Sequence, residues 1–199
     1  MRSVAWNLAG DSFITGGTGG EVLLWDVRQE QPIRQFNGHS LDAIVNSIAW
    51  HPSGDSFITG GTGGEVLLWD VRQEQPIRQF KGHRNYRGND ISMVWSLAGN
   101  TFVTVSDFGE VLLWDAGQEQ PIHQFKGQSN ISRPSNVKFV AWNPSGNTFV
   151  TVGSDGHLFL WDVRQEQPIR QFKGHSTNRD VRSVAWNPAG DSFVTVGGD

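Results

Sequence analysis

Two ladders of tryptophan divide this chain into copies of one unit. The first ladder has spacings of 44, 45, 47 and 44 residues and consists of Trp6, Trp50, Trp95, Trp142 and Trp186. The second is a Trp-Asp pair with spacings of 44, 45 and 47 residues, namely Trp25-Asp26, Trp69-Asp70, Trp114-Asp115 and Trp161-Asp162. A fixed period of about 20–50 residues is typical of repeat architectures, in which each unit buries its apolar face against its neighbours.

The units are closer copies than a shared fold requires. The 26 residues from Asp11 to Phe36 recur without change from Asp55 to Phe80. The 15 residues from Trp69 to His83 recur as Trp161 to His175. Recent duplication and design both explain such identity, and the sequence leaves the two open.

Within one unit the pattern predicts four short strands and no helix. In the second unit, residues 45–50, 56–59, 65–69 and 77–80 are rich in β-branched and apolar residues, and turn-forming residues separate them. The continuous apolar run 66–69 is typical of a strand enclosed between two layers, and Pro76 suits an outer edge strand. The predicted fold class is all-β, a β-propeller of four-stranded antiparallel blades. One array over residues 1–199 would hold four complete blades (about 2–39, 45–83, 91–127 and 137–175) and a two-stranded half blade (181–199).

Gly-His pairs also recur, at residues 38–39, 82–83 and 174–175. A recurring Gly-His pair followed by a Trp-Asp pair resembles the WD-repeat family, and the resemblance covers virtually the whole chain. In that family each blade holds a buried hydrogen-bonded network of His, Ser or Thr, Asp and Trp. A closed polar network of this kind fixes one packing of a blade. The resemblance implies network positions at His39, Thr59 and Trp69, at His83, Thr104 and Trp114, at Thr151, Asp155 and Trp161, and at His175, Thr195 and Asp199.

No unit supplies all four members of this network. Gly63 stands at the Asp position of the second unit, Phe108 at that of the third, and Gln128 at the His position of the fourth. We therefore expect the blades to be held mainly by apolar packing. The aspartates of the Trp-Asp pairs are interpreted as caps of the outer turns.

The units differ most between the fourth strand and the next first strand. In the related family these loops lie on one rim of the ring and engage partners, and loops on a rigid scaffold commonly carry binding. Tyrosine flanked by arginine also has the composition of an interface hot spot. Neutral drift of tolerant loops is the alternative. The candidate partner-binding residues are Arg84, Asn85, Tyr86, Arg87, Asn130, Arg133, Asn178 and Arg179.

Composition argues against several classes of function. The chain has no cysteine, its six histidines lack the spacing of metal ligands, and its net charge of −4 argues against nucleic-acid binding. Carboxylates repeated around a ring are poor candidates for an asymmetric acid–base pair. No apolar run has the length of a membrane helix or signal peptide, so the default expectation is a cytoplasmic protein. We expect no enzyme, no catalytic residue, no metal, no cofactor and neither a nucleic-acid nor a membrane partner.

The ends of the array raise the question of ring closure. The last unit carries only a first and a second strand, and segments 2–17 and 182–197 are near copies that would compete for one place. Three arrangements are open: two chains closing an eight-bladed ring as a homodimer, a fragment of a longer array, and four blades closing alone. We favour the first, since an array with two bare apolar faces exposes more apolar surface than is usual for a monomer.

The predicted function is a non-catalytic scaffold for protein or peptide interaction that completes its ring by self-association. Two alternatives remain. One is a structural repeat array, designed or recently amplified, with no selected ligand. The other is a multivalent carbohydrate binder with repeated pockets between blades.

Overall fold

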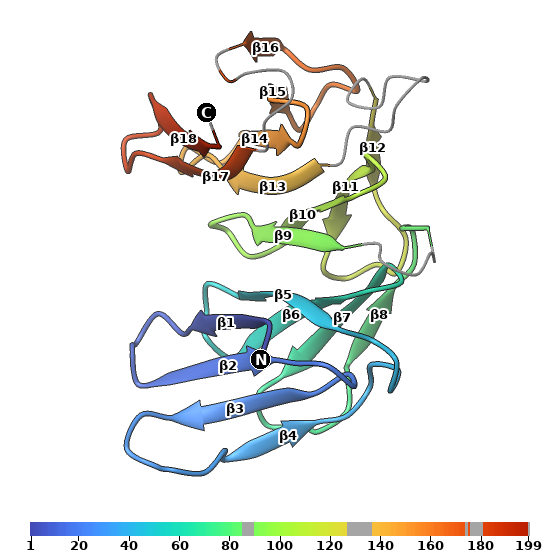
Figure 1. The fold of residues 1–199 in the computed structure, drawn as a ribbon, viewed down its shortest axis with the longest axis vertical. Coiled ribbons are helices and arrows are strands. Elements are labelled where there is room, and N and C mark those ends of the chain that lie inside the picture. The colour runs from blue at the N-terminus through green and yellow to red at the C-terminus, as the bar shows by residue number, and fades with distance from the viewer. Residues whose placement is uncertain (85–89, 127–136, 174, 176–180, 199) are drawn as a thin grey trace. The chain divides into compact units, whose positions relative to one another are not determined.

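The computed structural model describes residues 1–84, 90–126, 137–173, 175 and 181–198 (Figure 1). These residues form four four-stranded antiparallel sheets and one two-stranded sheet, which confirms the predicted all-β class. Within each sheet the strands follow chain order. None of the described residues forms a helix long and apolar enough to cross a membrane.

The chain divides into two compact units, Met1–Ile91 with Gln118–Gln120, and Ser92–Gly117 with Pro121–Asp199. The first unit contains two sheets. They are β1 (Ser3–Trp6), β2 (Ser12–Gly16), β3 (Val22–Asp26) and β4 (Arg34–Phe36), followed by β5 (Val45–Trp50), β6 (Ser56–Gly61), β7 (Glu65–Asp70) and β8 (Arg78–Phe80).

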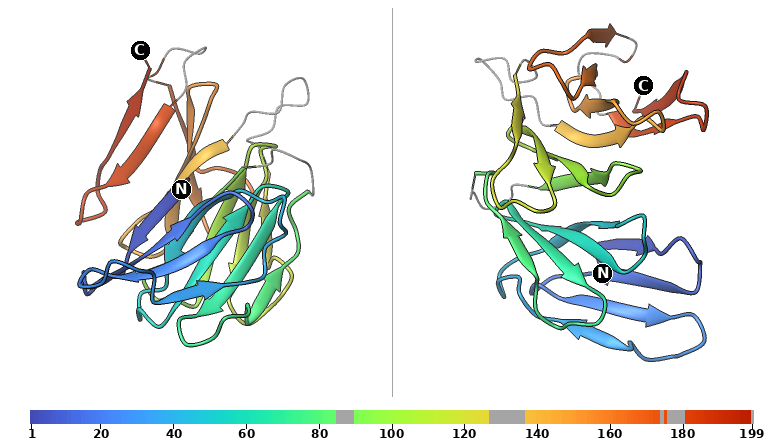
Figure 2. Two further views of the ribbon diagram at one scale, coloured as in Figure 1. Left: turned by 60° about the horizontal axis from the view of Figure 1, so that its bottom comes forward. Right: turned by 180° about the vertical axis from the view of Figure 1, so that it is seen from behind.

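The second unit holds the remaining sheets, apart from Ile91 at the start of β9. The third sheet is β9 (Ile91–Trp95), β10 (Thr101–Ser106), β11 (Val111–Asp115) and β12 (His123–Phe125). The fourth is β13 (Val137–Trp142), β14 (Thr148–Gly153), β15 (His157–Asp162) and β16 (Arg170–Lys173), and the fifth is β17 (Val181–Trp186) and β18 (Phe193–Gly197). Figure 2 shows this last hairpin beside the fourth sheet, where β17 packs against β13.

Local sequence explains the strands and the first turn of every sheet. The four apolar residues 66–69 of β7 are all buried, as predicted for a strand enclosed on both faces. The turn between the first and second strands requires a glycine with positive φ, because other residues rarely adopt that backbone region. It is supplied at the same place in every sheet by Gly10, Gly54, Gly99, Gly146 and Gly190, with φ between 74° and 96°.

Neighbouring sheets within a unit pack through the same aromatic group. Phe36, in the fourth strand of the first sheet, contacts Phe57 and Trp69 of the second sheet, with ring centroids 4.9 and 5.6 Å apart. Phe125 contacts Phe149 and Trp161 in the same way, at 5.0 and 5.4 Å. The core is therefore a series of equivalent contacts between sheets, as expected for a repeat architecture.

The first-strand tryptophan adds a hydrogen bond between sheets. The Trp50 indole N–H donates to the Ala5 carbonyl oxygen at 3.0 Å, and the Trp186 indole donates to that of Ala141 at 3.1 Å. Trp6 occupies the equivalent position in the first sheet and is 55% exposed. Trp142, in the same ladder, instead donates to the Gly146 carbonyl oxygen of its own sheet at 3.1 Å. The third-strand tryptophans pack against the sheet before them, as Trp69 does against Phe36.

Candidate functional site

Every four-stranded sheet contains the same polar pair, which is part-buried in the first sheet and buried in the other three. The indole N–H of the third-strand tryptophan donates to the hydroxyl of a second-strand threonine ten residues earlier. The distances are 2.9, 2.8, 2.7 and 2.8 Å for Trp25–Thr15, Trp69–Thr59, Trp114–Thr104 and Trp161–Thr151. Each pair satisfies a polar hydrogen that the core would otherwise leave without an acceptor.

In the second sheet this pair extends into a chain of four residues. His39 Nε2 lies 2.6 Å from the Thr59 hydroxyl, and His39 Nδ1 lies 2.9 Å from Glu65 Oε2. Because a carboxylate only accepts, Nδ1 carries a proton and donates to Glu65. The chain then runs from the Trp69 N–H through Thr59 and His39 to Glu65, and each of these polar atoms has a partner.

Glu65 is the member of this network that sequence reasoning missed. The resemblance led to Gly63 in the preceding turn as a lost aspartate, whereas the carboxylate comes from the first residue of β7. The hydrogen bond from the His39 N–H lowers the pKa of Glu65 and so keeps the carboxylate ionised. The available signal was a glutamate at this position in three units, at Glu21, Glu65 and Glu110.

The other predicted network residues take more varied places. Asp155 Oδ1 accepts from the His157 backbone N–H at 3.0 Å and its other oxygen lies 3.1 Å from His157 Nδ1, so it closes its own turn. His175 Nε2 lies 2.8 Å from the Thr195 hydroxyl, which reproduces half of the His39 arrangement in the fifth sheet. His83 is half-buried, and Asp199 lies outside the described residues.

The Trp-Asp aspartates cap the outer turns, as predicted. Asp70 Oδ1 accepts from the backbone N–H of Arg72 at 2.8 Å, and its carboxylate also pairs with the Arg72 guanidinium. Asp26 and Asp162 make the same contacts with the arginine two residues later. These hydrogen bonds lower the pKa of all three carboxyl groups to about 2.

The candidate rim residues fall mainly outside the described part of the chain. Arg84 is exposed, and its carbonyl oxygen lies 2.8 Å from where a Cβ on Gly64 would stand. Gly64 has a φ of 83°, so the β6–β7 turn needs glycine both for its backbone and for this close approach. Asn85, Tyr86, Arg87, Asn130, Arg133, Asn178 and Arg179 lie outside the described residues and stay predictions.

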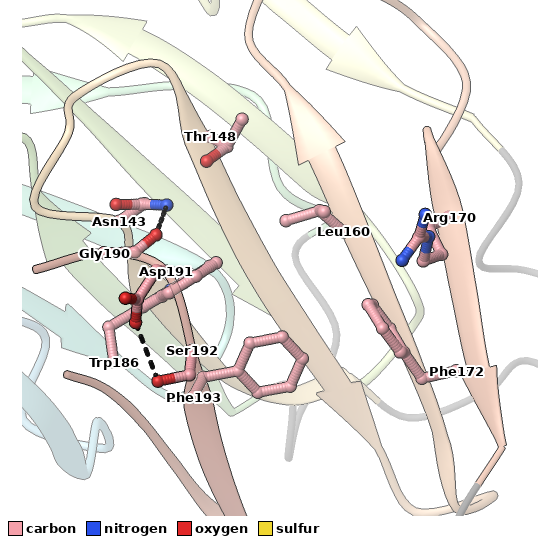
Figure 3. A pocket seen from close by; sticks show the side chains of 10 residues that line it. All are labelled: Asn143, Thr148, Leu160, Arg170, Phe172, Trp186, Gly190, Asp191, Ser192 and Phe193. Atoms are coloured by element: carbon pink, nitrogen blue, oxygen red, sulfur yellow. Dashed lines mark hydrogen bonds between the residues drawn. The ribbon is translucent and has the colours of Figure 1, made fainter.

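A cavity of about 550 Å³ lies between the fourth sheet and the last hairpin (Figure 3). Leu160 of β15 and Phe172 of β16 point toward Phe193 of β18, and Trp186 lies across from them. Its polar end is formed by Asn143, Thr148 and residues 190–192, where Asn143 Nδ2 donates to the Gly190 carbonyl oxygen at 3.0 Å. The cavity therefore combines an apolar floor with a hydrogen-bonding rim, which is typical of ligand sites.

The hydrogen bonds of the His39 network form a closed set. Each nitrogen of the His39 ring already has a partner inside a closed network. Among the described residues, no three His, Asp or Glu side chains are placed to hold a metal ion together.

Comparison with known proteins identifies the repeat. The model of the family described as "WD domain, G-beta repeat" matches residues 30–70, 119–162 and 166–199, which together exceed half of the chain. No curated protein matches the chain. The first match runs from before β4 to the end of β7, so a sequence repeat joins the outer strand of one sheet to three strands of the next. The chain belongs to the WD-repeat family, whose repeats form the blades of β-propellers.

Proposed function

We propose that this protein is a non-catalytic scaffold for protein or peptide partners, and that two copies associate to complete an eight-bladed ring. WD-repeat domains are commonly protein-interaction scaffolds, which supports the first part. The second part rests on one observation, the exposure of apolar side chains at positions that are buried where two blades meet.

The exposed positions belong to the first and the fifth sheets. Val194 of β18 is 68% exposed, whereas its counterparts Ile14 and Val150 are fully buried by the following sheet. Trp6 of β1 is 55% exposed, at the position from which Trp50 and Trp186 bond to the sheet before them. Burial of apolar surface drives association, so these faces favour contact with other polypeptides.

Light scattering on a sizing column, over a hundredfold dilution, tests self-association directly. The chain has a mass of 22.1 kDa, so a closed pair of copies has twice that mass. We expect the doubled mass for the unaltered chain and the single mass for Trp6→Ser. Leu97→Gln serves as the matched control. Leu97 is 64% exposed but lies in the third sheet, between β9 and β10, so this substitution should leave the mass unchanged. A single mass for the unaltered chain at every concentration refutes the ring of two copies.

A structural array without a selected ligand is the second candidate, and the unbroken identity of 11–36 with 55–80 favours it. The rim residues distinguish the two. If the scaffold function is correct, replacing Arg84 and the neighbouring Tyr86 together should abolish capture of a partner while leaving thermal unfolding unchanged. The absence of any partner whose capture depends on these residues supports the purely structural array.

A further inference from the structure

One residue separates the first two units where their sequences otherwise coincide. Residues 11–39 and 55–83 differ at a single position, where Asn37 stands in place of Lys81. The other two four-stranded sheets also have lysine there, Lys126 and Lys173. The pair Asn37-Gly38 is the one Asn-Gly sequence in the chain. Asparagine is thermolabile, and before glycine it loses its side-chain amide most readily, because no side chain shields the next backbone nitrogen.

The groups that would react are exposed and unbonded. Asn37 and Gly38 are both exposed and lie between β4 and β5. The Asn37 backbone N–H donates to the Glu74 carbonyl oxygen at 2.8 Å. Within the described part of the chain, however, neither the Asn37 carboxamide nor the Gly38 N–H has a hydrogen-bonding partner. Both residues also line a cavity of about 350 Å³, whose polar lining includes Thr18 and Glu21 and which is large enough to admit water.

The reaction open to this pair needs only water. The Gly38 nitrogen bonds to the side-chain carbonyl carbon of Asn37 and closes a five-membered succinimide. The carboxamide C–N bond breaks, and its nitrogen leaves as ammonia with the proton that Gly38 has lost. Water then opens the ring at either carbonyl, which gives aspartate or isoaspartate. In isoaspartate the main chain runs through the side-chain carbon and is one carbon longer.

Such a lengthened main chain would lie in a segment that is fixed at both ends. At one end, the residue 37 N–H is bonded to Glu74, in the outer turn of the second sheet. At the other end, His39 lies 2.6 Å from the Thr59 hydroxyl and 2.9 Å from Glu65 Oε2. The added carbon contributes about 1.5 Å of bond length between these two anchors.

The backbone between the anchors has no space to bulge toward the second sheet. A Cβ on Gly38 would lie 2.8 Å from Pro76 Cδ and 2.9 Å from Trp69 Cη2, which is closer than carbon atoms pack. The added carbon must therefore either break the bond to Glu74 or withdraw His39 from its network. Both outcomes weaken the contact between the first and second sheets.

The charge at residue 37 changes in the unfavourable direction as well. In the equivalent contact between the third and fourth sheets, the Lys126 backbone N–H donates to the Glu166 carbonyl oxygen at 2.8 Å. The Lys126 ammonium also pairs with the Glu166 carboxylate at 2.9 Å. Loss of the Asn37 amide puts a carboxylate at this position, next to the glutamate of the following sheet. The product thus repels where lysine attracts.

We propose that Asn37-Gly38 is a self-modifying site, at which the folded protein loses ammonia spontaneously and the isoaspartate product loosens the junction between the first and second sheets. The reaction needs no enzyme, and hydrolysis does not restore asparagine. The fraction of loosened chains therefore grows with the age of the protein. The inference is independent of the proposed scaffold function, because no partner takes part in the reaction.

Peptide mapping of the aged, folded chain tests the reaction. The protein is incubated in mildly alkaline buffer at physiological temperature and then digested with trypsin, which releases residues 35–72 as one fragment. The same fragment contains Asn46, whose carboxamide donates to Asp90 and serves as an internal comparison. We expect a gain of one mass unit at residue 37 and none at Asn46, with separate aspartate and isoaspartate forms. No gain at residue 37 in the folded chain, where the urea-unfolded chain reacts, overturns the proposal.

Urea denaturation tests the effect on the junction. Modified chains are separated from fresh ones by anion exchange, and we expect them to unfold at a lower urea midpoint. Asn37→Lys restores the residue of the other sheets, so its midpoint should stay constant during the same incubation. Asn37→Asp carries the new charge on a normal main chain and should lose less than the isoaspartate form.

Two outcomes contradict the effect on the junction. Equal midpoints for fresh and modified chains show that the junction tolerates isoaspartate, and this overturns the loosening. An ageing loss in Asn37→Lys as large as that in the unaltered chain places the cause at another residue and overturns the site.

Discussion

Replacing Trp69 by alanine tests the claim that packing between blades stabilises this fold. The Trp69 side chain is fully buried, donates to Thr59, stacks on Phe57 and meets the edge of Phe36. A large-to-small change at such a site costs about 3–5 kcal/mol, to which each lost ring pair contributes about 0.5–1.5 kcal/mol. We expect Trp69→Ala to lower the free energy of unfolding by an amount in that range.

Trp25 is a matched control inside the same chain. It lies in an identical stretch of 26 residues, donates to Thr15 at 2.9 Å and stacks on Phe13 at 5.9 Å. Its side chain is half-buried, because it lies on the face that also exposes Trp6. From the smaller apolar area removed from water, we expect Trp25→Ala to cost about 1–2 kcal/mol less than Trp69→Ala.

Urea denaturation followed by far-UV circular dichroism measures both costs. The two residues lie in one compact unit, so their variants report on the same cooperative element. The experiment is run at a concentration where the chain has a single mass, so that association does not add to stability. Equal losses for the two variants, or a loss below about 1 kcal/mol for Trp69→Ala, would refute the assignment of this tryptophan to the contact between blades.

Three further predictions follow from contacts in the second sheet. Thr59→Val should lower the free energy of unfolding by about 1–3 kcal/mol in urea denaturation, since it leaves two buried polar groups without their shared partner; an unchanged midpoint contradicts this. Gly64→Ala should destabilise more than Gly54→Ala, because both have positive φ but only Gly64 has a backbone oxygen within 2.8 Å of the added Cβ; equal melting temperatures would show that the close approach is unimportant. Asp70, whose pKa falls to about 2, stabilises the fold above pH about 4, and this contribution is lost as the pH falls toward 2. Arg72→Gln should therefore lower the urea midpoint at neutral pH and match the unaltered chain near pH 2, and a constant gap at all pH values argues against the pair.

The sequence predicted the elements of this fold that depend on regular repetition. The Trp69–Thr59 pair and the buried run 66–69 follow from a period that places equivalent residues in equivalent strands. The Asp70 cap follows from local sequence, because the aspartate stands two residues before Arg72, whose backbone N–H it accepts. Such features are local or periodic, and a single sequence shows both.

Other features depend on distances that a sequence does not show. Glu65 replaces a turn aspartate because its longer side chain reaches His39 from the start of β7, two residues beyond the expected place. The cavity beside Phe172 is lined from several segments that are separate in sequence, and its apolar lining consists of residues that in other blades are simply core. A pattern of apolar residues cannot indicate which member of a repeated core faces open space.

The offset between sequence repeats and sheets has a consequence for how such a protein can change in length. One sequence unit begins before the outer strand of one blade and ends with the Trp-Asp pair of the next. It therefore supplies one partner to the contact with the blade before it and one partner to the contact with the blade after it. When a whole unit is copied or deleted, the new neighbours meet through the same residue types as before. The contact of Phe36 with Phe57, for example, is chemically the same as that of Phe125 with Phe149. Units can therefore be gained or lost without creating a new kind of contact between neighbouring sheets.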